Sequence, residues 1–229
     1  MTIHFEKLGN DLASASSPIG TISVRRRGGF YRNFMKRVID SVLIIVAAPV
    51  LFPVVVFLAL FVARDGHAPI YTSKRVGENG KLFKMLKLRT MVPNAELLLA
   101  GHLASDRDAR EEWRSTQKLK NDPRITRFGR FLRKYSFDEL PQLWNVLSGD
   151  MSLVGPRPMI PEQRALYPGL AYYSLRPGIT GAWQVSDRND CEFARRAEHD
   201  REYDQQMSFL LDAKLLFRTV GVIIKGTGY

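Results

Sequence analysis

The sequence predicts a mostly helical α+β protein with an N-terminal membrane helix, one small sheet and amphipathic helices at a membrane surface. Three patterns indicate this class. A long apolar run occupies residues 42–63, and apolar and basic residues alternate in two short stretches within residues 70–91. Residues 209–225 are mostly apolar, with basic residues at helical spacing on one face. This last pattern fits either a helix at an anionic surface or a helix packed on the core.

Composition limits the class of partner and excludes two kinds of site. The 229-residue chain has 34 basic and 23 acidic residues, a net charge of +11. Such an excess suits nucleic acid, an anionic membrane surface or phosphorylated substrates, and charge alone does not choose among them. A single cysteine, Cys191, excludes an internal disulfide, and the four histidines lack the spacing of a zinc site.

The first two segments of the chain differ sharply in polarity. Residues 1–33 are expected to form a flexible tail, because their Ser- and Gly-containing start buries too little apolar surface to offset the entropy of ordering. The next segment, residues 34–66, contains the uncharged run at 42–63. As a helix this run is about 33 Å long, which is enough for a hydrocarbon core of roughly 30 Å. The second segment is therefore predicted to be a membrane helix.

The topology of this helix stays open on the residues alone. Basic residues flank it on both sides, so neither end is the less positive one. Pro49 and Pro53 lie in the middle, where each removes a hydrogen bond and can bend the helix. Two arrangements fit these features: a re-entrant helix with both ends on the cytoplasmic side, and a spanning helix kinked by proline.

Sheet and helix patterns follow the membrane helix. Two short strands are expected on either side of a turn at residues 78–80. Residues 94–118 are expected to form one or two polar-faced helices, with Gly101 as a possible break.

The most informative pattern surrounds two adjacent acids, Asp138 and Glu139. Pro141 is tolerated only in the first turn of a helix, so it places Asp138 near the N-cap and Glu139 at the first helical position. One interpretation is that Asp138 only caps the helix. Basic residues around the pair instead favour a site for an anionic substrate. They are Lys120, Arg124, Arg127, Arg130, Arg133 and Lys134, followed by Arg157 and Arg176 in proline-flanked turns.

Several ordered motifs resemble one protein family. They are KRVID at 36–40, KLRTM at 87–91, the run from DPRITRFGRF to GDMSLVGPRP at 122–158, and RPGITGAWQV at 176–185. The chain resembles the bacterial sugar transferases, the monotopic phosphoglycosyl transferases that move a hexose 1-phosphate from a UDP-sugar to undecaprenyl phosphate. The resemblance implies that residues 1–33 are cytoplasmic and that residues 34–66 enter and leave the bacterial cytoplasmic membrane on its cytoplasmic face. Residues 67–229 would then form the catalytic domain on that face.

The resemblance also implies roles for individual residues. Asp138 is expected to be the nucleophile that forms a phosphosugar-enzyme intermediate, and Glu139 to assist with the metal and the acceptor. Both carboxylates suit Mg²⁺, which commonly binds one or two carboxylates together with substrate phosphates. Guanidinium groups suit phosphate. Further substrate contacts are therefore expected from Arg133, Arg157 and Arg176, and also from Lys87, Arg89 and Asp200. Asp200 lies in HDREYD, where Glu202 or Asp204 could take its role.

The expected reaction starts exopolysaccharide synthesis, with galactose or glucose as the hexose, because the resemblance is nearest to small transferases of that kind. The expected partners are the UDP-sugar, undecaprenyl phosphate and the membrane, and not nucleic acid. The rival class is a basic, membrane-tethered binding protein without enzyme activity. That class predicts basic residues interleaved with stacking aromatics, a pattern that the sequence lacks.

Overall fold

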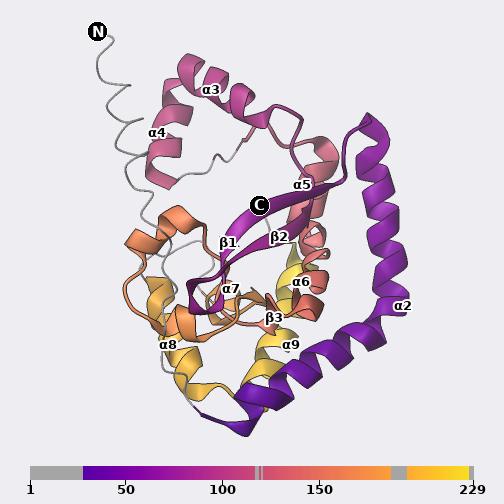
Figure 1. Ribbon diagram of the computed structural model, residues 1–229. Helices are drawn as coiled ribbons and strands as arrows, with labels where there is room; N and C mark the ends of the chain where they lie inside the picture. Colours follow the sequence, from indigo (N-terminus) through magenta and orange to yellow (C-terminus); the bar gives the residue numbers. More distant parts are fainter. Residues whose placement is uncertain (1–27, 117–118, 120, 187–194, 227–229) are drawn as a thin grey trace.

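The computed structural model describes residues 28–116, 119, 121–186 and 195–226. Most of the predicted tail, Cys191 and the end of the predicted 94–118 segment lie outside this part of the chain. Helices dominate it, as predicted, and two small sheets join them (Figure 1). The helices are α2 (Lys36–Val62), α3 (Ala95–Ser105), α4 (Arg107–Thr116), α5 (Arg127–Lys134), α6 (Gln142–Ser148), α7 (Ala182–Val185), α8 (Arg196–Gln206) and α9 (Phe209–Lys225). The strands are β1 (Ile70–Val76), β2 (Leu82–Leu88), β3 (Ser152–Val154) and β4 (Gly178–Thr180).

Helix α2 is the apolar segment that was predicted to enter a membrane. Helical conformation begins three residues before the predicted start at residue 34, with a π-helical turn at Tyr31–Met35, and continues through Pro49 and Pro53. Figure 1 shows that α2 bends sharply in its middle, as expected where prolines remove backbone hydrogen bonds. By length and composition this helix is suited to cross a membrane.

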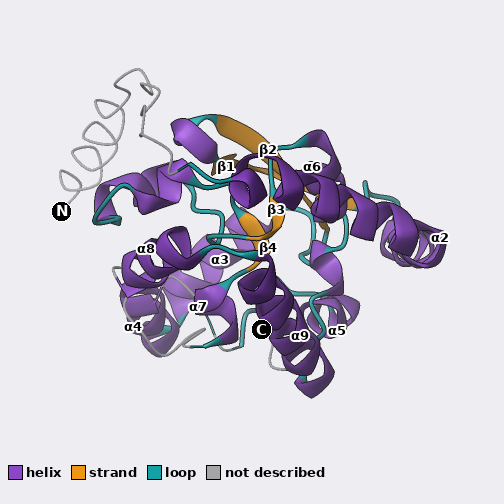
Figure 2. Cartoon of the chain, turned by 90° about the horizontal axis from the view of Figure 1, so that it is seen from below, coloured by secondary structure: helices purple, strands orange, loops and turns teal. Residues whose placement is uncertain are grey.

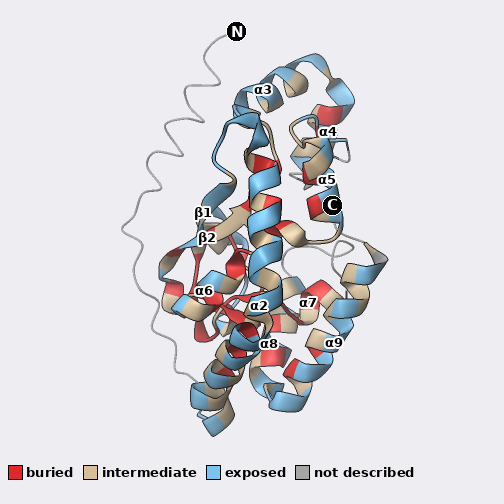
Figure 3. Cartoon of the chain, turned by 90° about the vertical axis from the view of Figure 1, so that its right-hand side faces the viewer, coloured by how far each residue is buried: buried red, intermediate tan, exposed pale blue. Residues whose placement is uncertain are grey.

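Both ends of α2 pack against the same globular part of the molecule. Ile44, near the start, lies in a core cluster with Met85 of β2 and Val146 of α6. Leu58, near the end, lies in another cluster with Leu88. Exposed apolar side chains occupy the stretch between these contacts, and they include Ile45, Val46, Val50, Phe52 and Phe57. Figure 3 shows this exposed stretch of α2 in pale blue, next to the buried residues around β2 and α6.

The predicted hairpin is confirmed. Strands β1 and β2 pair antiparallel, with Tyr71 opposite Lys87. A 3₁₀ turn at Glu78–Gly80 joins them, and Asn79 takes the left-handed conformation there, with φ of 55°. Asparagine adopts this conformation more readily than most residues because its short polar side chain can hydrogen-bond locally. The turn therefore forms where the sequence placed it.

The second sheet and α6 complete the part of the core that holds the site. Strands β3 and β4 pair in parallel, and Figure 2 shows them in the middle of the molecule, between α6 and α9. Helix α6 lies along the open edge of β2. There the Asn145 side chain accepts from the Leu86 N–H at 3.0 Å and donates to the Lys84 carbonyl at 2.8 Å. A buried amide thus pairs edge groups that water would otherwise have to satisfy.

The helical segment after residue 94 differs from the prediction in one detail. Gly101 lies inside α3, and the helix breaks instead at Asp106, between α3 and α4. The Asp106 side chain accepts a hydrogen bond from the Ala109 N–H at 3.0 Å, which is the geometry of a helix N-cap. A single glycine costs a helix only about 1 kcal/mol. Gly101 alone is therefore too weak a signal to end α3.

Helix α9 has two different faces, and the expected packing on the core is confirmed for one of them. Leu215 is buried and packs with Val154 and Tyr203, so one face belongs to the core. The opposite face exposes apolar side chains, with Phe217 82 % exposed, next to the exposed basic residues Lys214 and Arg218.

Candidate active site

Asp138 and Glu139 lie in a 3₁₀ turn, Phe137–Glu139, between α5 and α6. Pro141 is the N-cap residue of α6, so the predicted helix start is confirmed. The prediction that Asp138 lies near this cap is wrong by three residues. The hydrogen bonds just before α6 close i to i+3 turns, from the Leu140 N–H to the Phe137 carbonyl at 3.3 Å and from the Leu143 N–H to the Leu140 carbonyl at 3.1 Å. The acids therefore occupy a separate turn in front of the helix.

The two carboxylates converge on one lysine. Lys87 of β2 donates from Nζ to Glu139 Oε1 at 2.9 Å and to Asp138 Oδ2 at 3.4 Å. Asp138 is only 7 % exposed, whereas Lys87 keeps more of its side chain in contact with solvent. Asp138 and Glu139 thus both accept hydrogen bonds from one cationic group, the Lys87 ammonium.

Arg133 of α5 is a second cation whose charge acts on Asp138. Its Nε donates to Thr90 Oγ1 at 2.9 Å, which orients the guanidinium. Burial lowers the pKa of Arg133, and the charge of Asp138 acts in the opposite direction. Arg133 and Lys87 thus place two positive charges around the Asp138 carboxylate.

Burial has the largest effect on Asp138 and raises the pKa of its carboxyl group. The positive charge of Lys87 opposes this shift most strongly, the negative charge of Glu139 adds to it, and Arg133 opposes it further. The cations therefore favour the ionised form of a carboxylate that its surroundings would otherwise tend to protonate.

Arg157 and Asp200 lie together at a different place. They line a pocket with Tyr167, Trp183 and Arg196. Tyr167 donates its hydroxyl to Asp200 Oδ2 at 2.8 Å, and the Arg157 guanidinium lies 6.0 Å from the centre of the Trp183 ring. Burial raises the pKa of Asp200 to about 7, although the Tyr167 hydrogen bond and Arg196 act against this shift.

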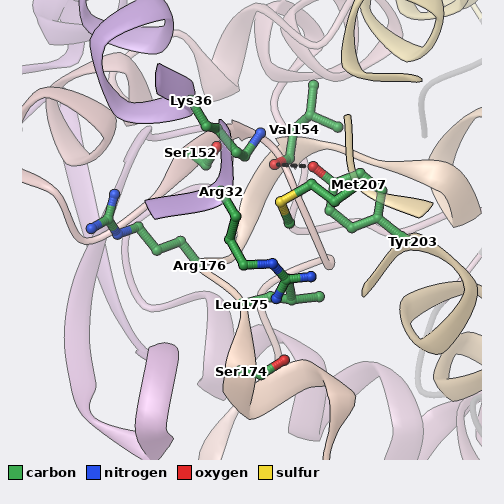
Figure 4. A pocket seen from close by; sticks show the side chains of 9 residues that line it. All are labelled: Arg32, Lys36, Ser152, Val154, Ser174, Leu175, Arg176, Tyr203 and Met207. Atoms are coloured by element: carbon green, nitrogen blue, oxygen red, sulfur yellow. Dashed lines mark hydrogen bonds between the residues drawn. The ribbon is translucent and has the colours of Figure 1, made fainter. Parts of the chain in front are cut away.

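Arg176 lies at a third place, in a pocket beside the start of α2 (Figure 4). Its guanidinium points away from Arg32 and Tyr203, and its Nε lies 3.6 Å from Glu78 Oε2. Asp204, one of the two alternatives to Asp200, also faces this region and binds Arg32 at 2.7 Å. Glu202, the other alternative, is exposed. Asp200 is therefore the one of the three acids that lines the pocket with Arg157.

Arg89 is held by the end of the apolar helix. It donates to both carboxylate oxygens of Asp65, at 2.8 and 2.6 Å, and to the carbonyls of Ala68 and Val62 at 2.9 and 3.2 Å. These contacts tie β2 to the C-terminal end of α2. The structure thus gives Arg89 a role in the fold.

Comparison with known proteins adds the family. A family model described as bacterial sugar transferase matches residues 31–226. The chain belongs to the bacterial sugar transferase family. The family predicted from the motifs is therefore confirmed.

The chain is similar to several curated relatives. It is 49 % identical over 198 residues to a UDP-galactose-lipid carrier transferase of Erwinia amylovora and 46 % identical over 198 residues to an undecaprenyl-phosphate galactose phosphotransferase of Salmonella typhimurium. Each match covers 86 % of this chain but only 42 % of the relative. An exopolysaccharide production protein, ExoY, of Rhizobium meliloti is 41 % identical over 221 residues, which are 94 % of this chain and 96 % of the relative.

Sequence reasoning missed three side chains that lie at predicted site residues. They are Thr90, which binds Arg133, and Trp183 and Arg196, which line the pocket of Asp200. Thr90 belongs to the KLRTM motif and Trp183 to RPGITGAWQV, so the motifs already marked their neighbourhoods. Arg196 follows a segment that the structure does not describe and carried no comparable signal.

Asp138 and Glu139 suit a magnesium site that is completed by substrate and water, and not one made of protein ligands alone. Within the described part of the chain, no three His, Cys, Asp or Glu side chains are grouped so that they could hold a metal by themselves. Mg²⁺, however, commonly takes one or two carboxylates and completes its shell with water and substrate phosphate. Asp138 and Glu139 would be the two carboxylates of such a site, since both lie near Lys87 Nζ, at 3.4 and 2.9 Å, and a metal bound by both would require Lys87 to move aside.

Proposed function

We propose that the chain transfers a hexose 1-phosphate from a UDP-sugar to undecaprenyl phosphate, with Asp138 as the covalent nucleophile. One observation carries this proposal. Asp138 is buried and the positive charges of Lys87 and Arg133 act on it, yet its one side-chain hydrogen bond in the described structure is long, 3.4 Å from Lys87. A buried carboxylate with unused acceptor capacity can approach an electrophile. The names of two relatives, which include galactose and a lipid carrier or undecaprenyl phosphate, support the substrate class.

In the first step an Asp138 oxygen attacks the β-phosphorus of the donor. A bond forms between that oxygen and phosphorus, the bond to the bridging oxygen breaks, and its electron pair leaves on UMP. Lys87 and Arg133 lower the repulsion between the carboxylate and the polyanionic donor. Mg²⁺, if held by Asp138 and Glu139, would neutralise phosphate charge in the same place.

In the second step a phosphate oxygen of undecaprenyl phosphate attacks the same phosphorus, and Asp138 leaves as a carboxylate. Glu139 lies next to Asp138 in the same turn, so its carboxylate can take a proton from a protonated acceptor phosphate. The product is the lipid-linked sugar diphosphate that starts exopolysaccharide synthesis.

We place the catalytic domain on the cytoplasmic face of the bacterial cytoplasmic membrane. Both ends of α2 pack on the same domain, through Ile44 and Leu58, while the apolar residues between them are exposed. A spanning helix would carry its two ends to opposite faces, so this arrangement supports a re-entrant helix bent at Pro49 and Pro53. The basic flanks and the exposed face of α9 support contact with an anionic cytoplasmic leaflet.

The membrane topology is tested by thiol labelling in intact cells. Cys191 is replaced by serine, and single cysteines are introduced as Gly28→Cys and Lys81→Cys. An impermeant thiol reagent should label neither position until the cells are opened. Labelling of only one of them in intact cells would restore the spanning helix.

The activity is tested by incubating the purified chain with UDP-galactose. Without an acceptor, the intact protein should gain the mass of one hexose phosphate, mapped to Asp138, and release UMP. Adding undecaprenyl phosphate should discharge the adduct to lipid. UDP-glucose in equal amount should compete less well, since the two most similar relatives reported above are named for galactose. Neither UMP release nor an adduct with any UDP-sugar would favour the rival class, a membrane-tethered binding protein.

A further inference from the structure

Strand β1 carries two polar side chains that the proposed mechanism does not use. Ser73 and Arg75 alternate with their neighbours, so they lie on the same face as Tyr71. Tyr71 stands directly opposite Lys87, and residues opposite each other in an antiparallel pair share a face. Ser73 and Arg75 therefore lie on the face of the hairpin that carries Lys87, at about 7 and 13 Å along the strand from its partner Tyr71.

Both side chains contain a buried polar atom without a partner. Arg75 Nε and Ser73 Oγ are buried and accept or donate no hydrogen bond within the described residues. Leaving a buried donor unpaired costs about 1–3 kcal/mol, and more for a charged group. Folded proteins rarely keep such groups, so two on one strand face need an explanation. A bound ligand would provide one.

The charge around Arg75 indicates the sign of that ligand. Burial lowers the pKa of Arg75 most, and the next cause is the positive charge of Arg157. The negative charge of Glu162 acts in the opposite direction and is the smallest of the causes, and its side chain is exposed. No carboxylate of the described chain forms an ion pair with Arg75 or Arg157. Two neighbouring guanidinium groups without an acid between them form a site for an anion.

We propose that Arg75, with Ser73 and Arg157, binds the phosphate of the nucleotide that leaves the donor. The proposal rests on the proposed function and adds to it. Lys87 and Arg133 would face the phosphorus that is transferred, while Arg75 would lie further along the same strand face, at the phosphate that stays on uridine. When the bridging bond breaks, its electron pair stays on UMP, and Arg75 would hold the charge that develops there.

The test measures binding of UMP and of uridine to the purified full-length chain in detergent by titration calorimetry. Arg75→Met should weaken UMP binding by roughly 10- to 100-fold, the effect of losing a charge-assisted hydrogen bond. Uridine binding should not change, because uridine has no phosphate. Lys74→Met is the matched control: it removes the same charge from the neighbouring, exposed residue on the other face of β1 and should leave UMP binding unchanged.

Two milder variants keep the test valid if Arg75→Met does not fold. Arg75→Lys keeps the charge but loses the Nε donor, and Ser73→Ala loses only the hydroxyl, so each should weaken UMP binding by a smaller factor, about fivefold for Ser73→Ala. Unchanged UMP affinity in the folded Arg75 variants would overturn the proposal, and so would absence of UMP binding to the unmodified chain. Failure of the proposed function gives a different result from failure of this proposal. The unmodified chain would then bind UMP in an Arg75-dependent way but would form no adduct on Asp138.

Discussion

Among the residues that the structure describes, two buried carboxylates each contact a lysine, and they differ in how many hydrogen bonds they accept. Asp212 of α9 is 5 % exposed and accepts three hydrogen bonds, from Tyr31 and Tyr203 at 2.7 Å each and from Lys36 at 2.5 Å. Asp138 is 7 % exposed, and its contact in the described structure is one long hydrogen bond from Lys87.

The difference separates a carboxylate that supports the fold from one that is available to react. Asp212 uses both oxygens to join the start of α2 to α8 and α9, so a substrate atom would have to displace existing bonds. Asp138 keeps acceptor capacity in a buried, positively charged surrounding. Burial alone therefore does not identify a reactive acid, and the number of hydrogen bonds that it accepts is more informative.

The largest expected effect is that of Asp138→Asn. Loss of a covalent nucleophile should lower kcat/KM for UMP release by at least about 10³-fold. Stability should change in the opposite direction. Because the pKa of Asp138 is raised in the folded state, folding loses stability as pH rises from the ordinary pKa of aspartate through the folded pKa. The variant should therefore unfold at higher denaturant concentration than the unmodified chain at pH 7, and this gain should shrink towards pH 4.

Asp108→Asn, at an exposed position on α4, is the matched control for Asp138→Asn. It should change neither activity nor the denaturation midpoint. Full UMP release by Asp138→Asn would remove Asp138 from the mechanism and with it the contrast between the two acids.

Asp212→Asn should show the reverse pattern. It leaves the Lys36 ammonium buried beside a neutral amide, and removing one partner of a buried ion pair costs about 3–5 kcal/mol. The free energy of unfolding from urea denaturation should fall by that amount, while UMP release per folded molecule stays unchanged. A variant as stable as the unmodified chain would show that the Asp212 cluster does not hold α2 to the domain.

Lys87→Met tests how much the neighbouring cation contributes at Asp138, because it removes the ammonium group that donates to this carboxylate. Lys87 lowers the pKa of Asp138, so without it the ionised form needs a higher pH, and the acidic limb of the kcat/KM profile should move upward. Near neutral pH the loss should be roughly 10- to 100-fold, the effect of one charge-assisted hydrogen bond. Lys84→Met, an exposed position on the same strand, is the control. An unshifted acidic limb would mean that Lys87 does not set the ionisation of Asp138.

The smallest effect is expected at Asp200. Its side chain accepts one short hydrogen bond, from Tyr167, so it is bonded more firmly than Asp138 and less fully than Asp212. Its pKa is raised to about 7, so folding should lose stability as pH rises from about 4 to 7. Asp200→Asn should remove that part of the pH dependence of the denaturation midpoint. If the variant and the unmodified chain show the same slope between pH 4 and 7, Asp200 is not the group that titrates there.

Much of the fold could be predicted because it depends on local patterns. The apolar run predicted α2, alternation predicted the hairpin, and Pro141 marked the start of α6 within the predicted region. Local signals failed where two of them competed, as at Gly101 and Asp106, because a capping side chain is a stronger helix boundary than a glycine. The substrate contacts predicted for Arg133, Arg157, Arg176, Lys87, Arg89 and Asp200, and the Mg²⁺ site, stay predictions.

The sequence by itself indicated the long apolar helix α2, the hairpin of β1 and β2, the start of α6, the family and the adjacency of Asp138 and Glu139, but not the second sheet. Each of these depends on residues that are close together in the chain. Only the tertiary structure decided which acid receives which cation: Lys36 is 176 positions from Asp212, and Lys87 is 51 positions from Asp138. It also placed Arg157 and Arg176 in two pockets that neither Asp138 nor Glu139 lines. Such pairings follow from how helices and strands pack, and no short pattern of residues carries that information.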